Sequence, residues 1–396
     1  MLIRTVARFS FIASIVSALK SYMLKSEDYE MLLKSESVDD VYDVLQRTYY
    51  KICFIGREKM DVESFERRLY EDYFSTFDKI YRRCPKASLK VMDAMYLKHE
   101  LYSLKMVLRA LMSGLDTEAA LQTIIPVGKY DLDLCRSILE SKSIQKAIGS
   151  VEEPNLRRTL TDLLKRQKDS LLLCLLEATI DRYSIMNIWK TLSPPWKSLS
   201  PIWKTLSPPW KSLPLVWRPS SYNFKPFSPA WRSLPPGSHK FAYRIVGKMA
   251  DLLNIMFILR SKYLGLDADT TGCFVIPIYC YLPPSELERL IQIPTAQDIT
   301  SLLTSGYYGK LITRASLGLD IDQTLSEIEV NFDRYIAKEC LYSFQGIRSN
   351  VGVIMAYLML KFNEISDIRA ILFGKANKLP VDNIRRILIL HQHTTS

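Results

Sequence analysis

The feature that most constrains the fold is a pattern that occurs three times along the chain. Each copy opens with an acidic residue, places a small polar residue three positions later, and has a leucine close to its end. Apolar residues between them recur at offsets 0, 3, 6 and 7, which is the spacing of one face of an α-helix. The copies are ELYSLKMVLRALMSGLD (100–116), DLLNIMFILRSKYLGLD (251–267) and EISDIRAILFGKANKLP (364–380). The sequence therefore predicts one amphipathic helix in three versions.

The residues that define this repeat are expected to be structural. They are the acid–polar pairs and an arginine shared by the first two copies: Glu100, Ser103, Arg109; Asp251, Asn254, Arg260; Glu364, Asp367. The acidic residues are expected mostly at helix starts, where they complement the helix dipole, and this interpretation is favoured over catalysis. For the two arginines, a helix cap or a salt bridge is the favoured interpretation, and a cavity shared between them is the alternative.

Two further elements repeat in the same order. SVDDVYDVLQRTYY (37–50) aligns with TAQDITSLLTSGYY (295–308), and 130–148 is a weaker relative. In each unit a Glu-x-x-apolar pattern, beginning at Glu66, Glu177 or Glu329, follows this stretch and precedes the acid-bearing helix. We therefore expect an all-α fold of three similar helical domains in a pseudo-threefold arrangement, with modules at 1–116, 117–267 and 268–396.

The second module carries a stretch of a different kind. Residues 189–236 repeat tryptophan at every seventh position from Trp189 to Trp217, and 11 of the 19 prolines fall between 194 and 236. The first two copies of the helix begin 151 residues apart and the last two 113 apart, so this stretch accounts for the excess. Its prolines predict an extended, disordered insertion. It is read as an expanded coding minisatellite or a gene-model artefact; docking at lipid headgroups, contact with a partner and a compact Trp-packed fold are the alternatives.

The net charge of +11 suggests a nucleic-acid partner, but it has a local origin. Residues 182–250 contain eleven basic and no acidic residues, which leaves 42 of each elsewhere. A basic nucleic-acid-binding helical protein, with Trp and Lys contacting bases and phosphates, remains the alternative hypothesis. The neutral charge of the rest of the chain argues against it.

No arrangement typical of catalysis or ligand binding occurs. There is no phosphate-binding loop, no nucleophile triad and no metal-ligand spacing, so no cofactor and no metal are expected. The seven cysteines have irregular spacing and are expected to be reduced. His391 and His393 lie in a tail where disorder is expected and weak metal binding is the alternative. The N-terminal residues resemble a signal peptide in part, but predict an amphipathic helix that continues through Leu24. No segment approaches the ~20 apolar residues of a membrane span.

The combination of these repeats resembles one family. The N-terminal helix (7–33), the Tyr-Tyr helix ends, the three repeated helices and above all EISDIRAILFGKANKLPVDNIRRILI (364–389) are similar to the C subunit of A/V-type ATPases, a relative of the d subunit of vacuolar ATPases. The resemblance covers about 1–188 and 240–390. It implies a funnel of three helical domains that lies on the cytoplasmic mouth of the proteolipid (c/K) ring. The funnel receives the central stalk, which contains the D and F subunits. Such a protein catalyses nothing, binds no nucleic acid, and lies peripherally at the membrane. It couples ion flow to ATP synthesis or hydrolysis.

Overall fold

The computed structural model describes residues 2–55, 61–166, 171–192, 240–312, 321–345 and 350–391. Within these ranges the chain forms helices and no β-strand, and one isolated bridge joins Val127 to Tyr130. The expected all-α class is confirmed. The chain divides into two compact units, of which unit 1 comprises 1–92, 235–245 and 311–396, and unit 2 comprises 93–234 and 246–310. The units do not follow the three sequence modules, so that division stays a prediction.

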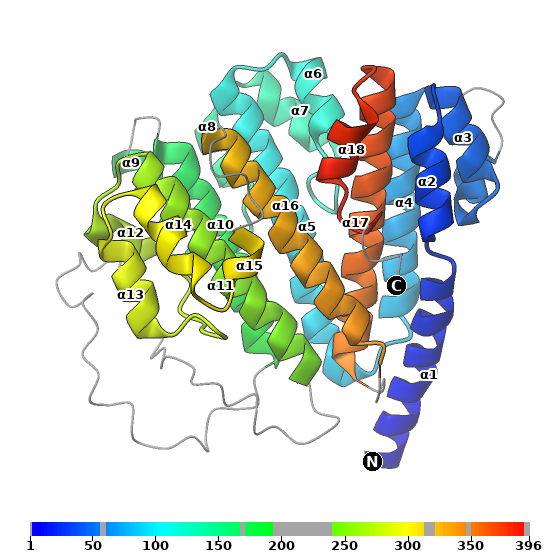
Figure 1. Ribbon diagram of the computed structural model, residues 1–396, viewed down its shortest axis with the longest axis horizontal. Coiled ribbons are helices and arrows are strands. Elements are labelled where there is room, and N and C mark those ends of the chain that lie inside the picture. The colour runs from blue at the N-terminus through cyan, green and yellow to red at the C-terminus, as the bar shows by residue number, and fades with distance from the viewer. Residues whose placement is uncertain are drawn as a thin grey trace. The chain divides into compact units, whose positions relative to one another are not determined.

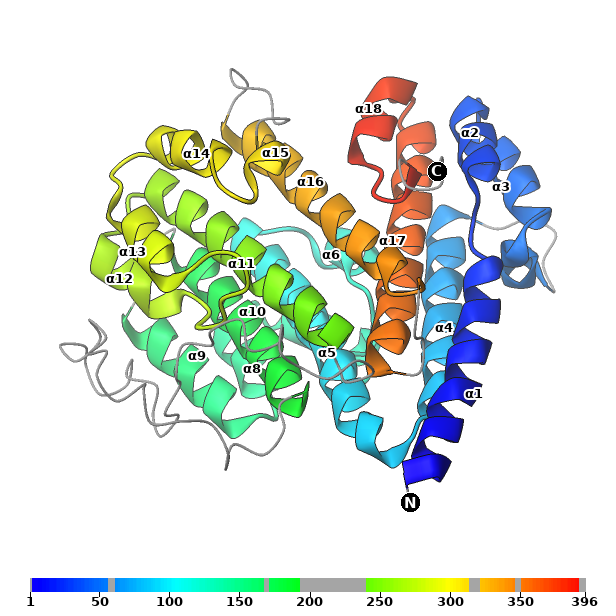
Figure 2. The ribbon, with the colours of Figure 1, turned by 60° about the horizontal axis from the view of Figure 1, so that its bottom comes forward.

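Unit 1 is organised around one long buried helix, α17 (Val351–Ala376). Eighteen of its residues are buried, and it contacts α1, α3, α4, α16 and α18. Figure 1 shows α17 beside α4 and α18, and Figure 2 shows α1 running along α4 and α17. The other helices of unit 1 are α1 (Leu2–Ser21), α2 (Ser26–Lys34), α3 (Val38–Gln46), the 3₁₀ helix η1 (Tyr49–Phe54), α4 (Val62–Tyr81), α16 (Ile321–Tyr342) and α18 (Val381–Ile387).

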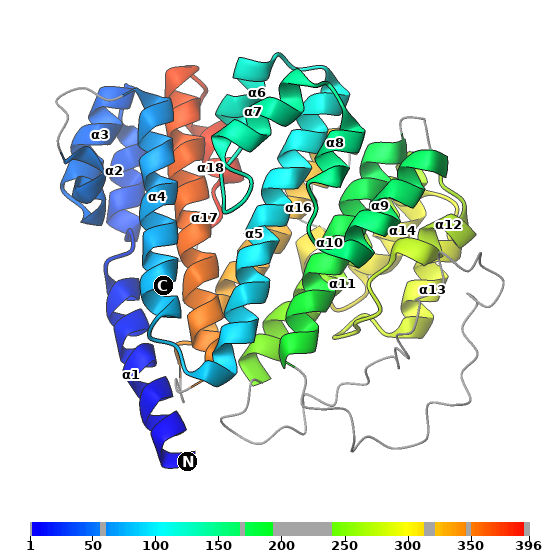
Figure 3. The same cartoon turned by 180° about the vertical axis from the view of Figure 1, so that it is seen from behind.

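Unit 2 contains pairs of shorter helices packed on long ones. Within it α10 packs against α9 and α12, and α6 packs against α7, as Figure 3 shows for the first and last of these pairs. Its helices are α6 (Thr117–Thr123), α7 (Leu132–Glu140), α8 (Ile144–Gly149), α9 (Pro154–Arg166), α10 (Leu171–Leu192), α12 (Ala268–Phe274), α13 (Pro284–Gln292) and α14 (Ala296–Thr304). Three helices cross a unit boundary: α5 (Lys86–Ser113), α11 (Lys240–Tyr263) and α15 (Gly309–Ile312).

The two best-matching short stretches begin their helices in the same way. The Ser37 hydroxyl accepts the backbone N–H of Asp40, and the Asp40 carboxylate accepts the N–H of Ser37 in return. Thr295 accepts the N–H of Asp298 and donates its hydroxyl to that carboxylate. Each pair satisfies N–H groups that have no partner inside the helix. Asp40 and Asp298, which the sequence repeat aligns, are therefore the capping acids of α3 and α14.

The repeated helices α5, α11 and α17 also end alike. In each, the leucine after the turn donates its N–H back to a carbonyl five residues earlier: Leu115 to Ala110, Leu266 to Ser261, and Leu379 to Gly374. The residue before that leucine has a left-handed conformation in all three copies, with φ of 67° at Gly114, 74° at Gly265 and 53° at Lys378. This is the usual way in which a glycine ends a helix, and the third copy does it with a lysine.

Three sequence expectations are corrected. Trp189 and the three residues after it belong to α10, and Trp189 is buried, so one tryptophan is part of the packed protein. The rest of the expected insertion, 193–236, lies outside the described residues. Helix α1 ends at Ser21 and does not continue through Leu24, because the backbone turns there toward a buried acid of α17. His391 is buried and its Nε2 lies 2.7 Å from a Glu30 oxygen, so it is ordered by an ion pair or hydrogen bond; His393 lies outside the described residues.

Candidate functional site: the buried acids of the repeated helices

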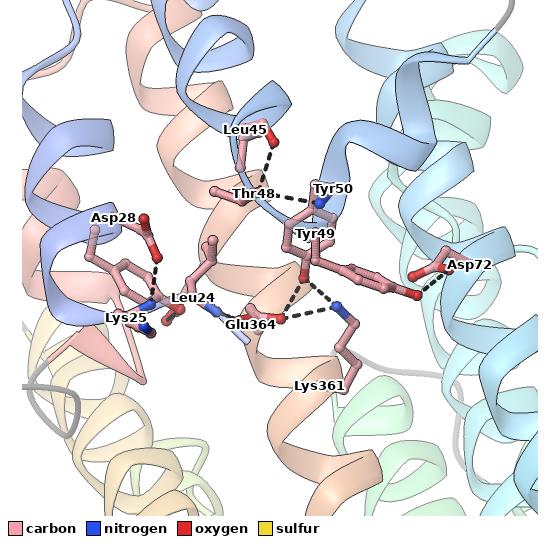
Figure 4. Close-up of polar contacts among 12 residues, drawn as sticks. Leu24, Lys25, Asp28, Leu45, Thr48, Tyr49, Tyr50, Asp72, Lys361 and Glu364 are labelled. Carbon is pink, nitrogen blue, oxygen red and sulfur yellow. Dashed lines mark hydrogen bonds and ion pairs between the residues drawn. The ribbon is translucent and has the colours of Figure 1, made fainter. Parts of the chain in front are cut away.

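Glu364, in the middle of α17, is completely buried and accepts three hydrogen bonds. Its Oε1 accepts the backbone N–H of Leu24, which lies in the link between α1 and α2. Its Oε2 accepts the Tyr50 hydroxyl at 2.6 Å and the Lys361 ammonium at 3.1 Å. Figure 4 shows these donors converging on the carboxylate from both sides. One acid of α17 thus fixes the link after the first helix and the start of η1.

Lys361 is the buried countercharge of this acid. Its side chain is 3% exposed, and its ammonium lies 4.6 Å from the ring centre of Tyr49 and 4.1 Å from that of Tyr50. Two ring faces stabilise a cation that has lost its water. The Tyr49 hydroxyl continues the network outward by donating to Asp72 at 3.1 Å. Because the buried acid and the buried lysine are both partnered, the cluster avoids the high cost of an unpaired buried charge.

Unit 2 contains the same arrangement around Asp251 of α11. Its two oxygens accept the backbone N–H groups of Cys280, Tyr281 and Leu282 at 3.1, 2.7 and 3.2 Å, and the Tyr308 hydroxyl at 2.8 Å. The preceding lysine, Lys248, is 2% exposed. Its ammonium lies 5.2 Å from the ring centre of Tyr281 and 5.6 Å from that of Tyr307.

The two clusters share a buried lysine, a buried acid and a pair of tyrosines. The lysine stands three positions before the acid, as Lys361 and Lys248. The tyrosine pairs are edge-to-face, with interplanar angles of 78° for Tyr49–Tyr50 and 86° for Tyr307–Tyr308. A further tyrosine stacks on the first of each pair, Tyr22 on Tyr49 and Tyr281 on Tyr307. In the sequence the acids and the tyrosine pairs belong to two separate repeats. In the structure the second tyrosine of each pair bonds the acid, Tyr50 to Glu364 and Tyr308 to Asp251.

The polar residue three positions after each acid also has a constant role. Ser103 donates to the carbonyl of Ile125, Asn254 bonds both the N–H and the carbonyl of Ile276, and Asp367 accepts the N–H of Ile389. In every copy the partner is an isoleucine 22 positions further along the chain. The polar residue therefore holds the segment that follows its own helix.

The first copy has a reduced form of the site. Glu100 is half-buried and accepts the backbone N–H of Lys129 at 3.1 Å. Gly128, just before that lysine, has φ of 54°, and a Cβ there would lie 2.0 Å from the Glu100 Oε1. Only glycine leaves room for the carboxylate. Leu97 occupies the position of the lysine three residues before the acid, so the buried cation is missing from this copy.

Burial favours the neutral form of two aspartates of the repeated helices, Asp251 and Asp367. It raises the pKa of Asp251 to about 6 and that of Asp367 to about 7, while the N–H and tyrosine donors act in the opposite direction. Burial and the nearby carboxylates likewise raise the pKa of Tyr29 and Tyr50 well above the ordinary value. The carboxylate oxygens are occupied by protein donors. This arrangement suits the fixing of backbone segments better than proton transfer to a substrate.

The two arginines of the repeat differ in their surroundings. Arg109 pairs with Glu177 of α10, with Nη2 and Oε2 at 3.0 Å, so the salt bridge expected for it is present. Arg260 lies near the Cys174 thiol, whose pKa is raised by burial to about 11 while the guanidinium acts to lower it. Arg109 therefore joins its helix to α10, and Arg260 lies beside a cysteine of the same helix α10.

The third copy replaces this arginine with Phe373, which is 61% exposed. Arg369, four positions earlier in α17, pairs instead with Glu66 of α4 at 2.8 Å and with the Tyr70 hydroxyl at 2.9 Å. Glu66 and Glu177 are two of the three glutamates of the Glu-x-x-apolar repeat. In two copies, therefore, the aligned glutamate holds an arginine of the repeated helix.

The two buried lysines, Lys248 and Lys361, were not predicted from the sequence, although their spacing from the acids could have indicated them. Lys-x-x-acid occurs at 248–251 and 361–364, one helical turn apart on the same face. Among the described residues, no group of three His, Cys, Asp or Glu side chains is placed to hold a metal ion. Within the same ranges, no helix is both long and apolar enough to cross a bilayer.

Comparison with known proteins gives the family. The model of the ATP synthase (C/AC39) subunit family matches residues 12–200 and 230–387. The chain belongs to this family. The match leaves out 201–229, which lies within the tryptophan- and proline-rich stretch 189–236. The family confirms the resemblance stated from the sequence.

Relatives in archaea match over nearly the whole chain. The C subunit of the A-type ATP synthase of Methanocaldococcus jannaschii is 19% identical over 97% of this chain and 86% of its own length. The same subunits of Methanococcoides burtonii and Archaeoglobus fulgidus are each 21% identical over 97% of this chain and cover 95% and 97% of their own lengths. This member of the family is thus a subunit of an A/V-type ATP synthase, a membrane-associated complex, and is not itself an enzyme.

Proposed function

We propose that the chain is a central-rotor subunit that links the central stalk to the proteolipid ring. In this role it lies peripherally on the cytoplasmic face of the membrane, binds the c/K ring on one side and the D and F subunits on the other, and couples ion translocation to ATP synthesis or hydrolysis. The observation that carries the proposal is the family match, which extends over 12–200 and 230–387.

The buried clusters supply a physical reason for the role. A coupling element must transmit torque without local yielding, which requires dense packing and links that are costly to break. Removing one partner of a buried, hydrogen-bonded ion pair costs about 3–5 kcal/mol. Glu364 and Lys361 form such a pair in unit 1. In unit 2, the buried Asp251 holds residues 280–282 and Tyr308 through hydrogen bonds.

The proposal includes three helical modules, 1–116, 117–267 and 268–396, in a pseudo-threefold funnel. The recurring contacts support it, since the cap residues Gly114, Gly265 and Lys378 occupy one position in the three copies. The contacts to Ile125, Ile276 and Ile389 occupy another.

Nucleic-acid binding is the weaker candidate. Several cations of the basic window 182–250 are engaged inside the protein. Arg182 donates to the Cys273 carbonyl, Arg244 pairs with Glu339 at 2.9 Å, and Lys248 is buried. A basic face built on the folded helices needs exposed cations, and these three do not provide them.

Reconstitution tests the proposal. The full chain and a variant lacking 201–229 are mixed with a detergent-solubilised proteolipid ring and the D–F stalk, and the products are separated by size. We expect both chains to join the ring and the stalk, because the family match does not need 201–229. A Glu364→Gln chain, which disturbs the buried cluster, is expected to join with reduced yield.

Two results would contradict the proposal. One is that neither chain joins the ring or the stalk although it is folded by circular dichroism. The other is that the full chain binds single-stranded DNA at physiological salt, with affinity that falls steeply as salt is added, and does so equally without 201–229.

A further inference from the structure

Unit 1 has a hollow of about 420 Å³ between the C-terminal ends of α2 and α17 and the start of α18. Four cations line it, one from α2, one near the end of α17, one just after α17, and one from α18: Lys34, Lys375, Lys378 and Arg385. Glu30 and Glu36 are the acids in the lining, so the hollow carries a net positive charge. Leu379 and Val381, at its edge, are 39% and 38% exposed.

The four cations are not equally free. Lys375 donates to the Leu33 carbonyl at 2.7 Å, and Arg385 pairs with Glu30 at 3.2 Å. Lys34 and Lys378 are exposed, and within the described residues neither has a carboxylate at ion-pair distance. Two lysines thus remain available to an anionic partner, one from α2 and one from the turn after α17.

Lys378 occupies a position where the backbone favours glycine. The equivalent residues of the other two copies are Gly114 and Gly265, with the same left-handed conformation. A side chain in this conformation costs on the order of 1 kcal/mol. The lysine is therefore kept at this position at some cost in backbone strain. The helix end itself does not need the lysine, because the turn is made by the backbone bond from Leu379 to Gly374 in the same way as in the other copies.

We propose that this hollow docks an acidic segment of a partner protein, with Lys378 and Lys34 binding its carboxylates and with Leu379 and Val381 contacting an adjacent apolar side chain. The inference goes beyond the rotor role and rests on the hollow alone. A concave site with exposed apolar residues beside two available lysines fits a protruding peptide better than a flat headgroup surface. The paired Glu30 lies on the wall and selects against a uniformly anionic surface.

The test uses a substitution that is expected to weaken binding of the partner segment and to stabilise the folded protein. In Lys378→Gly the left-handed residue becomes glycine, as in the other two copies. Lys142, in unit 2, has φ of 48° and is exposed, so Lys142→Gly is a matched control with the same chemical change and backbone conformation. The probe is a fluorescent ten-residue peptide of glutamates flanking two central leucines, titrated against each full-length chain by anisotropy. The uncharged glutamine version of the peptide is the second probe.

We expect Lys378→Gly to weaken binding of the glutamate peptide about two- to five-fold, the effect of losing one exposed charge contact. The same variant should raise the thermal unfolding midpoint by about 1–2 °C, because strain is relieved. Lys142→Gly should raise the midpoint similarly and leave peptide affinity unchanged.

Three results would overturn the inference. In the first, Lys378→Gly binds the peptide as tightly as the original chain. In the second, the glutamine peptide binds equally well. In the third, Lys378→Gly instead loses binding to phosphatidylglycerol vesicles and retains the peptide, which would assign the lysine to the membrane.

Discussion

Asp367 illustrates how one residue can make the protein sensitive to pH. It is 1% exposed and accepts two backbone N–H groups, from Ile389 at 2.7 Å and Leu390 at 2.8 Å, and the Tyr29 hydroxyl at 3.1 Å. Burial raises its pKa to about 7, above the ordinary value near 4 that it has in the unfolded chain. The folded protein therefore binds the proton more tightly than the unfolded chain does. The stabilisation from this proton is complete below about pH 4 and is lost as the pH rises through about 7.

Asp367→Asn should remove this dependence. The equivalent residue of the second copy is an asparagine, Asn254, whose Oδ1 accepts the N–H of Ile276 as Asp367 Oδ1 accepts that of Ile389. From pH 5 to pH 8 the free energy of unfolding of the original chain should fall by about 2–3 kcal/mol more than that of the variant. Urea unfolding followed by circular dichroism at both pH values measures the difference. Asp39→Asn, at an exposed carboxylate, is the control and should follow the original chain. Parallel pH profiles for all three chains would show that Asp367 does not titrate in this range.

The repeat in the sequence pointed to the acids Glu100, Asp251 and Glu364 but could not identify their partners. The offsets of Glu100, Asp251 and Glu364 follow from helix periodicity, which is local. The donors do not, because Leu24 lies 340 residues from Glu364 and Tyr308 lies 57 from Asp251. Which distant N–H reaches a carboxylate depends on how the helices pack, and periodicity contains no information about this.

At the scale of elements, the repeated helices show how a helix end is specified. In the sequence each copy closes with a leucine, and in the structure that leucine directly follows the left-handed residue at the end of the helix, which is Gly114, Gly265 or Lys378. The sequence did not predict where α5, α11 and α17 begin, because each starts well before its acid in residues without a shared pattern. It also counted Trp189 with the proline-rich stretch. The apolar face of α10 extends to Leu192 before the first proline pair, and burial there decides the boundary.

Two glycine substitutions should have opposite effects on stability. Gly265 has φ of 74°, and a Cβ added there would meet nothing within 4 Å, so Gly265→Ala should cost about 1 kcal/mol through backbone strain alone. Gly272 lies inside α12 with equally open space and an ordinary φ, so Gly272→Ala should stabilise by about 0.5–1 kcal/mol. Thermal unfolding of both variants beside the original chain gives the comparison. Equal shifts of the same sign would mean that the left-handed end of α11 does not matter.

At the scale of the whole molecule, the two units are interleaved in the sequence. Unit 1 is built from three separate segments of the chain and unit 2 from two. Each has its own buried cluster, the Lys361–Glu364 ion pair with its tyrosines in unit 1 and Asp251 with its hydrogen-bond donors in unit 2. A substitution in one cluster should therefore destabilise its own unit and leave the other unit folded.

Hydrogen exchange should show this separation. Glu364→Gln leaves Lys361 without its countercharge and should destabilise unit 1 by about 3–5 kcal/mol. Amides in 22–54 and 351–391 should exchange faster, while those in 246–310 should keep their protection. Asp251→Asn is the matched variant and should give the reverse pattern. If each variant accelerates exchange equally throughout the chain, the protein unfolds as one cooperative body instead.

The bond from Leu24 to Glu364 has a consequence for the order of synthesis. A ribosome makes about 5–20 residues per second, so helices α1 to α4 emerge roughly 20–70 s before the acid that holds them. Unit 2 is complete once residue 310 has been made, but the nascent first unit still lacks its central helix. During that interval the apolar faces destined for α17 are open to solvent, where chaperones or aggregation compete for them. Chains terminated after residue 310 should therefore have a finished second unit and a first unit that is sensitive to protease.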